Sequence, residues 1–141
     1  MPDPLSGSCL CGAIRYAVSA PLSSSPSELR ACHCTHCQKT SGAGGSVNLP
    51  VSSDAFRITQ GTPKRYAAKA DSGRTLYRFF CADCGSPIYS QRETNPGVVM
   101  LRAGTLDNAG NMKITAHIWT TSRRPWSHID PAANQIPGQP N

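Results

Sequence analysis

The sequence has few of the features that mark membrane, long-helical or nucleic-acid-binding proteins. Aromatic residues make up 6% and charged residues 16% of its 141 positions. No apolar stretch approaches the ~18 residues of a membrane-spanning helix. Residues 1–8 are polar and lack the apolar run of a signal peptide. We therefore expect a cytoplasmic protein that does not enter the membrane.

Long stretches free of helix breakers are also missing, because 12 glycines and 12 prolines are spread along the chain. Apolar and polar residues alternate instead, beginning where Ile14, Tyr16 and Val18 share one face of an extended segment. Similar short segments follow at 29–33, 46–50, 56–59, 63–67, 75–80, 88–91, 98–103 and 114–119. Turn signals lie between them at 60–62, 71–73, 95–97 and 108–111, and the serine-rich segment 23–27 predicts a surface loop.

This pattern predicts an all-β fold built from small antiparallel sheets. The length fits a single domain over residues 1–141. We expect its core to occupy about residues 5–130. The proline-containing tail, 131–141, is expected to be partly ordered.

Acidic residues are scarce, and the formal net charge is +6. Seven thiolates and two Zn²⁺ would together change this charge by −3, to +3, because zinc binds the thiolate form of cysteine. The basic residues are scattered and form no stripe with aromatic residues, so we expect no nucleic-acid partner. The remaining positive charge favours a small anionic substrate.

Cysteine, in contrast, is abundant and clustered. The seven cysteines form three groups: Cys9 and Cys11; Cys32, Cys34 and Cys37; Cys81 and Cys84. In a reducing compartment such groups indicate metal ligands or catalytic thiols rather than disulfides, and the odd count also argues against complete disulfide pairing.

The two pairs have the form of half-sites. Cys81 and Cys84, followed by Gly85, have the spacing of a zinc knuckle, although a redox dithiol has the same spacing in a βαβ context. Cys9 and Cys11 would project to one face of an extended backbone. Together the pairs could complete a closed, four-cysteine structural site.

The group of three leaves a tetrahedral zinc with one open position. His36 is an alternative fourth ligand that would close the site, whereas His33 should point away from the face that Cys32 and Cys34 share. A zinc ion with three thiolates carries a formal charge of −1, which disfavours hydrolysis and favours capture of a thiol or weak polarisation of an aldehyde. The signature of zinc deaminases is absent. For His117 and His128 we expect packing and surface roles.

Several motifs resemble one known family, the glutathione-dependent formaldehyde-activating enzymes, which also includes centromere protein V-like proteins. The matching segments are residues 7–16, 32–39, 41–42 and 79–88, with further similarity at 104–107, 117–119 and 125–126. Their order and spacing extend over residues 5 to about 130.

The resemblance implies a β-tent fold with two zinc ions per chain, and partial occupancy is allowed at the second. It implies a structural zinc on Cys9, Cys11, Cys81 and Cys84, and a catalytic zinc on Cys32, Cys34 and Cys37. The activity it implies is a carbon–sulfur lyase reaction, the reversible formation of S-hydroxymethylglutathione from glutathione and formaldehyde. The expected partner is therefore a small thiol or aldehyde substrate such as glutathione, for which Arg15, Lys39 and Ser41 are candidate contacts.

Two other functions stay open at this point. One is a non-catalytic, zinc-scaffolded binding module, whose three-cysteine site would be empty or closed by His36. The other is a thiol-based redox sensor, in which oxidation of the Cys32–Cys37 group releases zinc.

Overall fold

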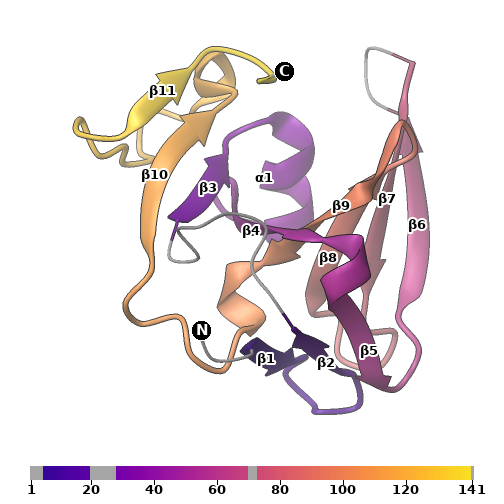
Figure 1. Ribbon diagram of the computed structural model, residues 1–141. Coiled ribbons are helices and arrows are strands. Elements are labelled where there is room, and N and C mark those ends of the chain that lie inside the picture. The colour runs from indigo at the N-terminus through magenta and orange to yellow at the C-terminus, as the bar shows by residue number, and fades with distance from the viewer. Residues whose placement is uncertain (1–4, 20–27, 70–72, 141) are drawn as a thin grey trace.

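The computed structural model describes residues 5–19, 28–69 and 73–140 (Figure 1). The serine-rich segment 23–27 lies outside these residues. The strands are β1 (Leu5–Ser8), β2 (Arg15–Val18), β3 (Glu28–Cys32), β4 (Ser46–Ser52), β5 (Phe56–Gln60), β6 (Lys64–Lys69), β7 (Thr75–Phe80), β8 (Pro87–Arg92), β9 (Asn95–Arg102), β10 (Lys113–Ile118) and β11 (Asn134–Ile136). One α-helix, α1 (Thr35–Ser41), and short 3₁₀ turns accompany them in the described part of the chain. The all-β fold class is confirmed.

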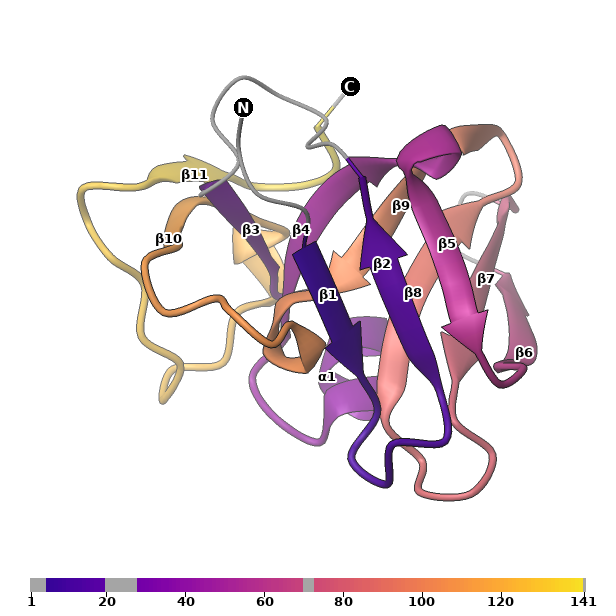
Figure 2. The ribbon, with the colours of Figure 1, turned by 60° about the horizontal axis from the view of Figure 1, so that its bottom comes forward.

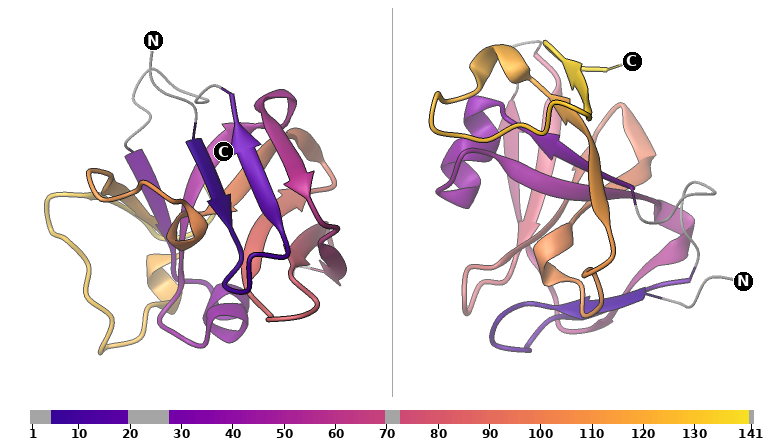
Figure 3. Two further views of the ribbon diagram at one scale, coloured as in Figure 1. Left: turned by 90° about the horizontal axis from the view of Figure 1, so that it is seen from below. Right: turned by 90° about the vertical axis from the view of Figure 1, so that its left-hand side faces the viewer.

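The described residues form two sheets. The smaller sheet has the order β1-β2-β5, and the larger has the order β11-β10-β3-β4-β9-β8-β7-β6. The smaller sheet lies across the middle strands of the larger one (Figures 2 and 3). The predicted alternation is confirmed in β2, where Tyr16 and Val18 are each 1% exposed and Ala17 is only half-buried.

A row of aromatic rings joins the two sheets. Tyr16 of β2 contacts Phe56 of β5 with ring centroids 5.5 Å apart, and Phe56 meets Tyr89 of β8 edge-on at 4.7 Å. Tyr89 in turn stacks on Phe79 of β7 at 4.2 Å. These contacts bury large apolar surfaces in the same layer as Val51, Ile88 and Leu101.

The strand pairing differs from the prediction in two places. β10 runs parallel to β3, and β11 runs parallel to β10, whereas the other paired strands are antiparallel. The C-terminal part of the chain thus returns beside β3 and extends the larger sheet to eight strands. β11 lies within the tail 131–141.

One turn is also placed differently. The predicted turn at 95–97 lies within β9, and the chain reverses at 93–94, between the partners Arg92 and Asn95. Pro96 is compatible with the strand because it is the second residue of β9 and has no partner in the β8–β9 register, so its missing N–H breaks no ladder bond. Its carbonyl accepts a 2.6 Å hydrogen bond from Gln91 Nε2.

The helix α1 was not predicted because seven residues are too few to show a 3.6-residue period. The hydrogen bonds at its two ends explain where the helix begins and ends. The Cys34 sulfur accepts a hydrogen bond from the Cys37 N–H at 3.3 Å, as an N-cap does. Gly42, at φ 69°, ends the helix, and its N–H donates to Gln38 O. Among the described residues no helix is long and apolar enough to cross a membrane.

Gly45 allows the chain after α1 to approach the end of β3. A Cβ atom at this position would overlap the carbonyl oxygen of Cys32 and come within 3.1 Å of its carbonyl carbon. Both are backbone atoms, so no side-chain rotation could relieve the overlap. The glycine therefore determines how closely β3 and β4 pair at Cys32 and Ser46.

We predict that Gly45→Ala lowers the free energy of unfolding by about 1–3 kcal/mol, the usual cost of forcing an extra group into a packed site. Gly110→Ala is the matched control, since a Cβ there meets nothing within 4 Å. Urea unfolding followed by circular dichroism measures both. Equal midpoints for the two variants would contradict the assignment.

Candidate metal centres

The structure brings four cysteines from two distant parts of the chain together. The sulfur atoms of Cys9, Cys11, Cys81 and Cys84 all lie within 4.8 Å of one another. Two of the separations are 3.6 Å, between Cys9 and Cys11, and 3.8 Å, between Cys11 and Cys81. Zn–S bonds of ~2.3 Å in a tetrahedron place the sulfurs about 3.8 Å apart. The four-cysteine cluster therefore fits a zinc ion and could hold one.

Two similar turns place these four sulfurs. The first turn is closed by a hydrogen bond from Gly12 N–H to Cys9 O (3.2 Å), and the second by one from Gly85 N–H to Cys81 O (2.8 Å). Gly12 and Gly85 have φ angles of 79° and 80°, a backbone conformation that residues with a side chain rarely adopt. Cys9 and Cys11 thus meet through a turn and not, as the spacing suggested, along an extended strand.

Ser86 links the two turns. Its hydroxyl oxygen accepts a hydrogen bond from Leu10 N–H at 3.0 Å and lies 3.2 Å from Cys84 Sγ. The hydrogen bond with the Ser86 side chain, followed by one with its backbone, lowers the pKa of Cys84 to about 5. A thiol with this pKa is present as the thiolate that zinc requires.

The second cluster contains three sulfurs. Cys32 ends β3, Cys34 caps α1, and Cys37 lies in the first turn of the helix, and their sulfurs are all within 4.8 Å of one another. Cys32 and Cys37 are buried and Cys34 is half-buried. Within the described ranges no histidine, aspartate or glutamate atom joins this group, and this includes His36. The three-cysteine cluster could hold a metal ion with one position free of protein ligands.

The electrostatic surroundings favour a thiolate in this cluster. Hydrogen bonds from Cys32 and then Cys34 lower the pKa of Cys37, and Ser46 and Arg102 act in the same direction. Hydrogen bonds with Cys34 and then with Cys37 raise the pKa of Cys32. Cys37 is therefore readily present as the thiolate that zinc binds.

Gln38 holds the helix against the C-terminal part of the chain. Its Nε2 donates to His33 O at 2.9 Å and to Ser122 O at 3.0 Å, while its Oε1 accepts from Arg124 Nε at 2.8 Å. All three bonds keep the buried amide satisfied, so α1 has one orientation relative to β3.

His33 and His117 form a buried pair. The His33 Nε2 lies 2.8 Å from His117 Nδ1, and the rings stack with centroids 5.1 Å apart. Burial lowers the pKa of both rings. His33 therefore faces His117 and stays out of the sulfur cluster, as predicted, and His117 has the packing role expected of it. His128 is exposed.

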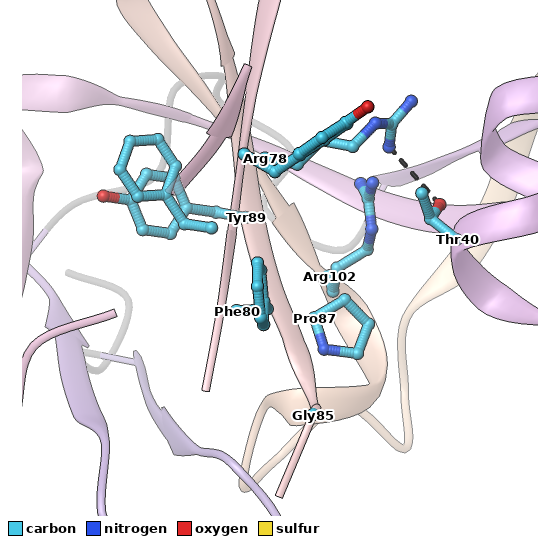
Figure 4. Close-up of a pocket in the computed structure, with 9 residues that line it drawn as sticks. Thr40, Arg78, Phe80, Gly85, Pro87, Tyr89 and Arg102 are labelled. Carbon is cyan, nitrogen blue, oxygen red and sulfur yellow. Dashed lines mark hydrogen bonds between the residues drawn. The ribbon is translucent and has the colours of Figure 1, made fainter. Parts of the chain in front are cut away.

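The three residues expected to contact the substrate do not lie at the cavity. Arg15, Lys39 and Ser41 are exposed, and none of them lines the cavity beside α1. That cavity is lined instead by Arg78 of β7 and Arg102 of β9 (Figure 4). The sequence carries no clear signal for Arg78, because its burial (7% exposed, on a strand whose other residues are half-buried) is visible only in the structure.

The chain is similar to known proteins over most of its length. Residues 4–122 match the family described as "Glutathione-dependent formaldehyde-activating enzyme". A protein of Halomonas elongata, 34% identical over 109 residues, and one of Penicillium rubens, 32% identical over 85 residues, are both named as candidate enzymes of this kind. These matches cover 74% and 60% of this chain, and 66% and 42% of the respective relatives.

A crystal structure of a Rhodobacter sphaeroides protein has the same fold. Its TM-score is 0.57 at 21% sequence identity, and the match covers 73% of this chain and 88% of that one. At this identity the likeness extends to the fold alone. From the match over residues 4–122, the chain belongs to the glutathione-dependent formaldehyde-activating enzyme family.

Proposed function

We propose that this protein is a zinc-dependent carbon–sulfur lyase that forms and cleaves a thiol–aldehyde adduct, with S-hydroxymethylglutathione as the first candidate. The observation that carries this proposal is the three-cysteine cluster, in which three sulfurs converge with no fourth protein ligand among the described residues. Membership of the family and the names of the two relatives support the choice of thiol and aldehyde.

In the proposed arrangement, Cys9, Cys11, Cys81 and Cys84 hold a structural ion, and Cys32, Cys34 and Cys37 hold a catalytic one. Zinc at the second site supplies a weak Lewis acid, because three thiolates offset its charge, and this suits thiol–aldehyde exchange better than hydrolysis. Burial of Cys32 and Cys37 limits the access of water to the ligands.

The proposed reaction needs no oxidant or reductant. In the forward direction the thiol sulfur forms a bond to the carbonyl carbon of formaldehyde, and the thiol proton is transferred to the carbonyl oxygen. In the reverse direction the carbon–sulfur bond breaks, the hydroxyl proton returns to sulfur, and formaldehyde leaves. The protein's part is to hold the two reactants in one geometry.

The position of the His36 ring distinguishes this proposal from a closed, purely structural site. It lies in α1 next to Cys37, but its ring nitrogens are outside the group of sulfurs that meet within 4.8 Å. A binding module closed by His36 is therefore not favoured by this geometry.

We predict two zinc ions per chain for protein equilibrated with zinc and freed of excess metal by gel filtration, and about one for Cys37→Ser treated in the same way. Plasma emission spectrometry on protein of known concentration measures both. His36→Ala, the matched control, should keep two ions. A content of one ion in the wild type, or loss of an ion in His36→Ala, would contradict the proposed ligand sets.

The two clusters should differ in their effect on stability. Cys84→Ser is expected to unfold at a much lower urea concentration than Cys37→Ser, because the four-cysteine cluster joins segments that are 70 residues apart at Cys11 and Cys81. Equal loss of stability in the two variants would overturn the division into structural and catalytic sites.

We predict that Cys37→Ser lowers the catalysed rate of adduct formation from glutathione and formaldehyde at least ~100-fold, to near the uncatalysed rate. Exchange spectroscopy by NMR at equilibrium measures the rate in both directions. His36→Ala should retain the wild-type rate. A wild-type rate equal to that of the uncatalysed reaction would exclude the lyase assignment for this substrate.

A further inference from the structure

A cavity of about 180 Å³ lies beside the three-cysteine cluster. Thr40 of α1, Arg78 of β7 and Arg102 of β9 line it together with Phe80 and Pro87 (Figure 4). Arg102 relates the cavity to the cluster, since it interacts electrostatically with the thiols of Cys37, Cys32 and Cys34. On the other side, the Thr40 hydroxyl donates to the backbone carbonyl of Cys37 at 3.3 Å. A water molecule occupies about 30 Å³, so the cavity has room for a small organic group.

Most N–H donors of the two arginines that line this cavity make no hydrogen bond to the described residues. Arg78 Nη1 donates to Thr40 Oγ1 at 3.4 Å, and Arg102 Nη1 donates to Asn48 Oδ1. Both acceptors are neutral. Neither guanidinium pairs with an aspartate or glutamate in the part of the chain that the structure describes. Each guanidinium has five N–H donors, so at least four on each are available to a ligand.

The two arginines are unusual because both are partly or largely buried without an acidic partner among the residues that the structure describes. Arg78 is 7% exposed and Arg102 is only partly exposed. A cation that leaves water without an acidic partner costs free energy, and two such cations close together also repel each other. Arg102 interacts electrostatically both with Arg78 and with the thiols of Cys37, Cys32 and Cys34. When ionised, these thiols are negative groups that attract the Arg102 guanidinium.

These thiols compensate only part of the positive charge. Three thiolates and one divalent ion have a net charge of −1, whereas the two guanidiniums carry +2. One positive charge remains at the cavity. A carboxylate would neutralise it, and its two oxygens match the planar fork of a guanidinium.

We infer that Arg78 and Arg102 form a carboxylate-binding subsite beside the three-cysteine cluster, so that the thiol substrate carries a carboxylate close to its sulfur. The assignment of the sulfur to the cluster rests on the proposed function, whereas the carboxylate subsite rests on the two arginines and the cavity. Thr40 orients Arg78, and Asn48 orients Arg102. Phe80 and Pro87 form the apolar part of the cavity wall.

The test compares two probes that differ only in charge, 3-mercaptopropionate and 3-mercaptopropionamide, by isothermal titration calorimetry on the zinc-loaded protein without aldehyde. The wild type should bind the acid at least about tenfold more tightly, as expected for charge-assisted hydrogen bonds. Arg78→Gln and Arg102→Gln should each reduce this preference to within about twofold and leave the affinity for the amide unchanged. Arg78→Lys should keep part of the preference.

Arg57→Gln is the matched control, because Arg57 is exposed on β5 in the smaller sheet, and it should keep the full preference. Equal binding of acid and amide by the wild type would overturn the subsite, whether or not any variant folds. A variant that loses both probes equally would also overturn it, since the arginine would then only support the structure. Because no aldehyde is present, failure of the lyase assignment would leave the acid-over-amide preference intact.

Discussion

The convergence of Cys9 and Cys11 with Cys81 and Cys84 is the constraint on which the rest of the structure depends. The first pair follows β1 and the second follows β7, so their contact joins the small sheet to the large one. The aromatic row from Tyr16 to Phe79 spans the same junction. The sulfurs are spaced as a tetrahedral ion requires, and metal binding there would contribute directly to the free energy of folding.

The three-cysteine cluster depends on a second set of contacts. β3 ends at Cys32, Gly45 lets the returning chain approach it, and Gln38 fixes the orientation of α1 through three hydrogen bonds. Cys32 and Gln38 are on regular elements and Gly45 lies directly before β4, which gives the sulfurs a defined geometry. The arginines come from β7 and β9, the two strands that flank β8, so one face of the large sheet supplies positive charge next to the thiols.

Local patterns allowed much of this structure to be predicted. The nine strand segments correspond to β2 through β10, and the grouping of cysteines by spacing agrees with the sulfurs that meet in space. Three kinds of feature lacked a local signal. The helix α1 is shorter than two full periods, the parallel pairing of β3 with β10 joins residues far apart in sequence, and β11 is only three residues long.

Arg78 shows why the functional surroundings were harder to predict than the ligands. Cysteines are recognised by type and spacing, whereas an arginine on a strand is usually exposed, and only its burial beside Thr40 and the cavity distinguishes it. Arg15 and Lys39 were more conspicuous in sequence because they lie next to the cysteine motifs, yet both are exposed.

The central claim is that three cysteines hold a zinc ion whose fourth position is open to substrate. A crystal structure with anomalous data at the zinc edge, from crystals soaked in 3-mercaptopropionate, tests it most directly. The account predicts one ion bound by Cys9, Cys11, Cys81 and Cys84. It predicts a second ion bound by Cys32, Cys34 and Cys37, with the soaked thiol or a solvent molecule as its fourth ligand. A single ion per chain, or a second ion closed by His36, would contradict it.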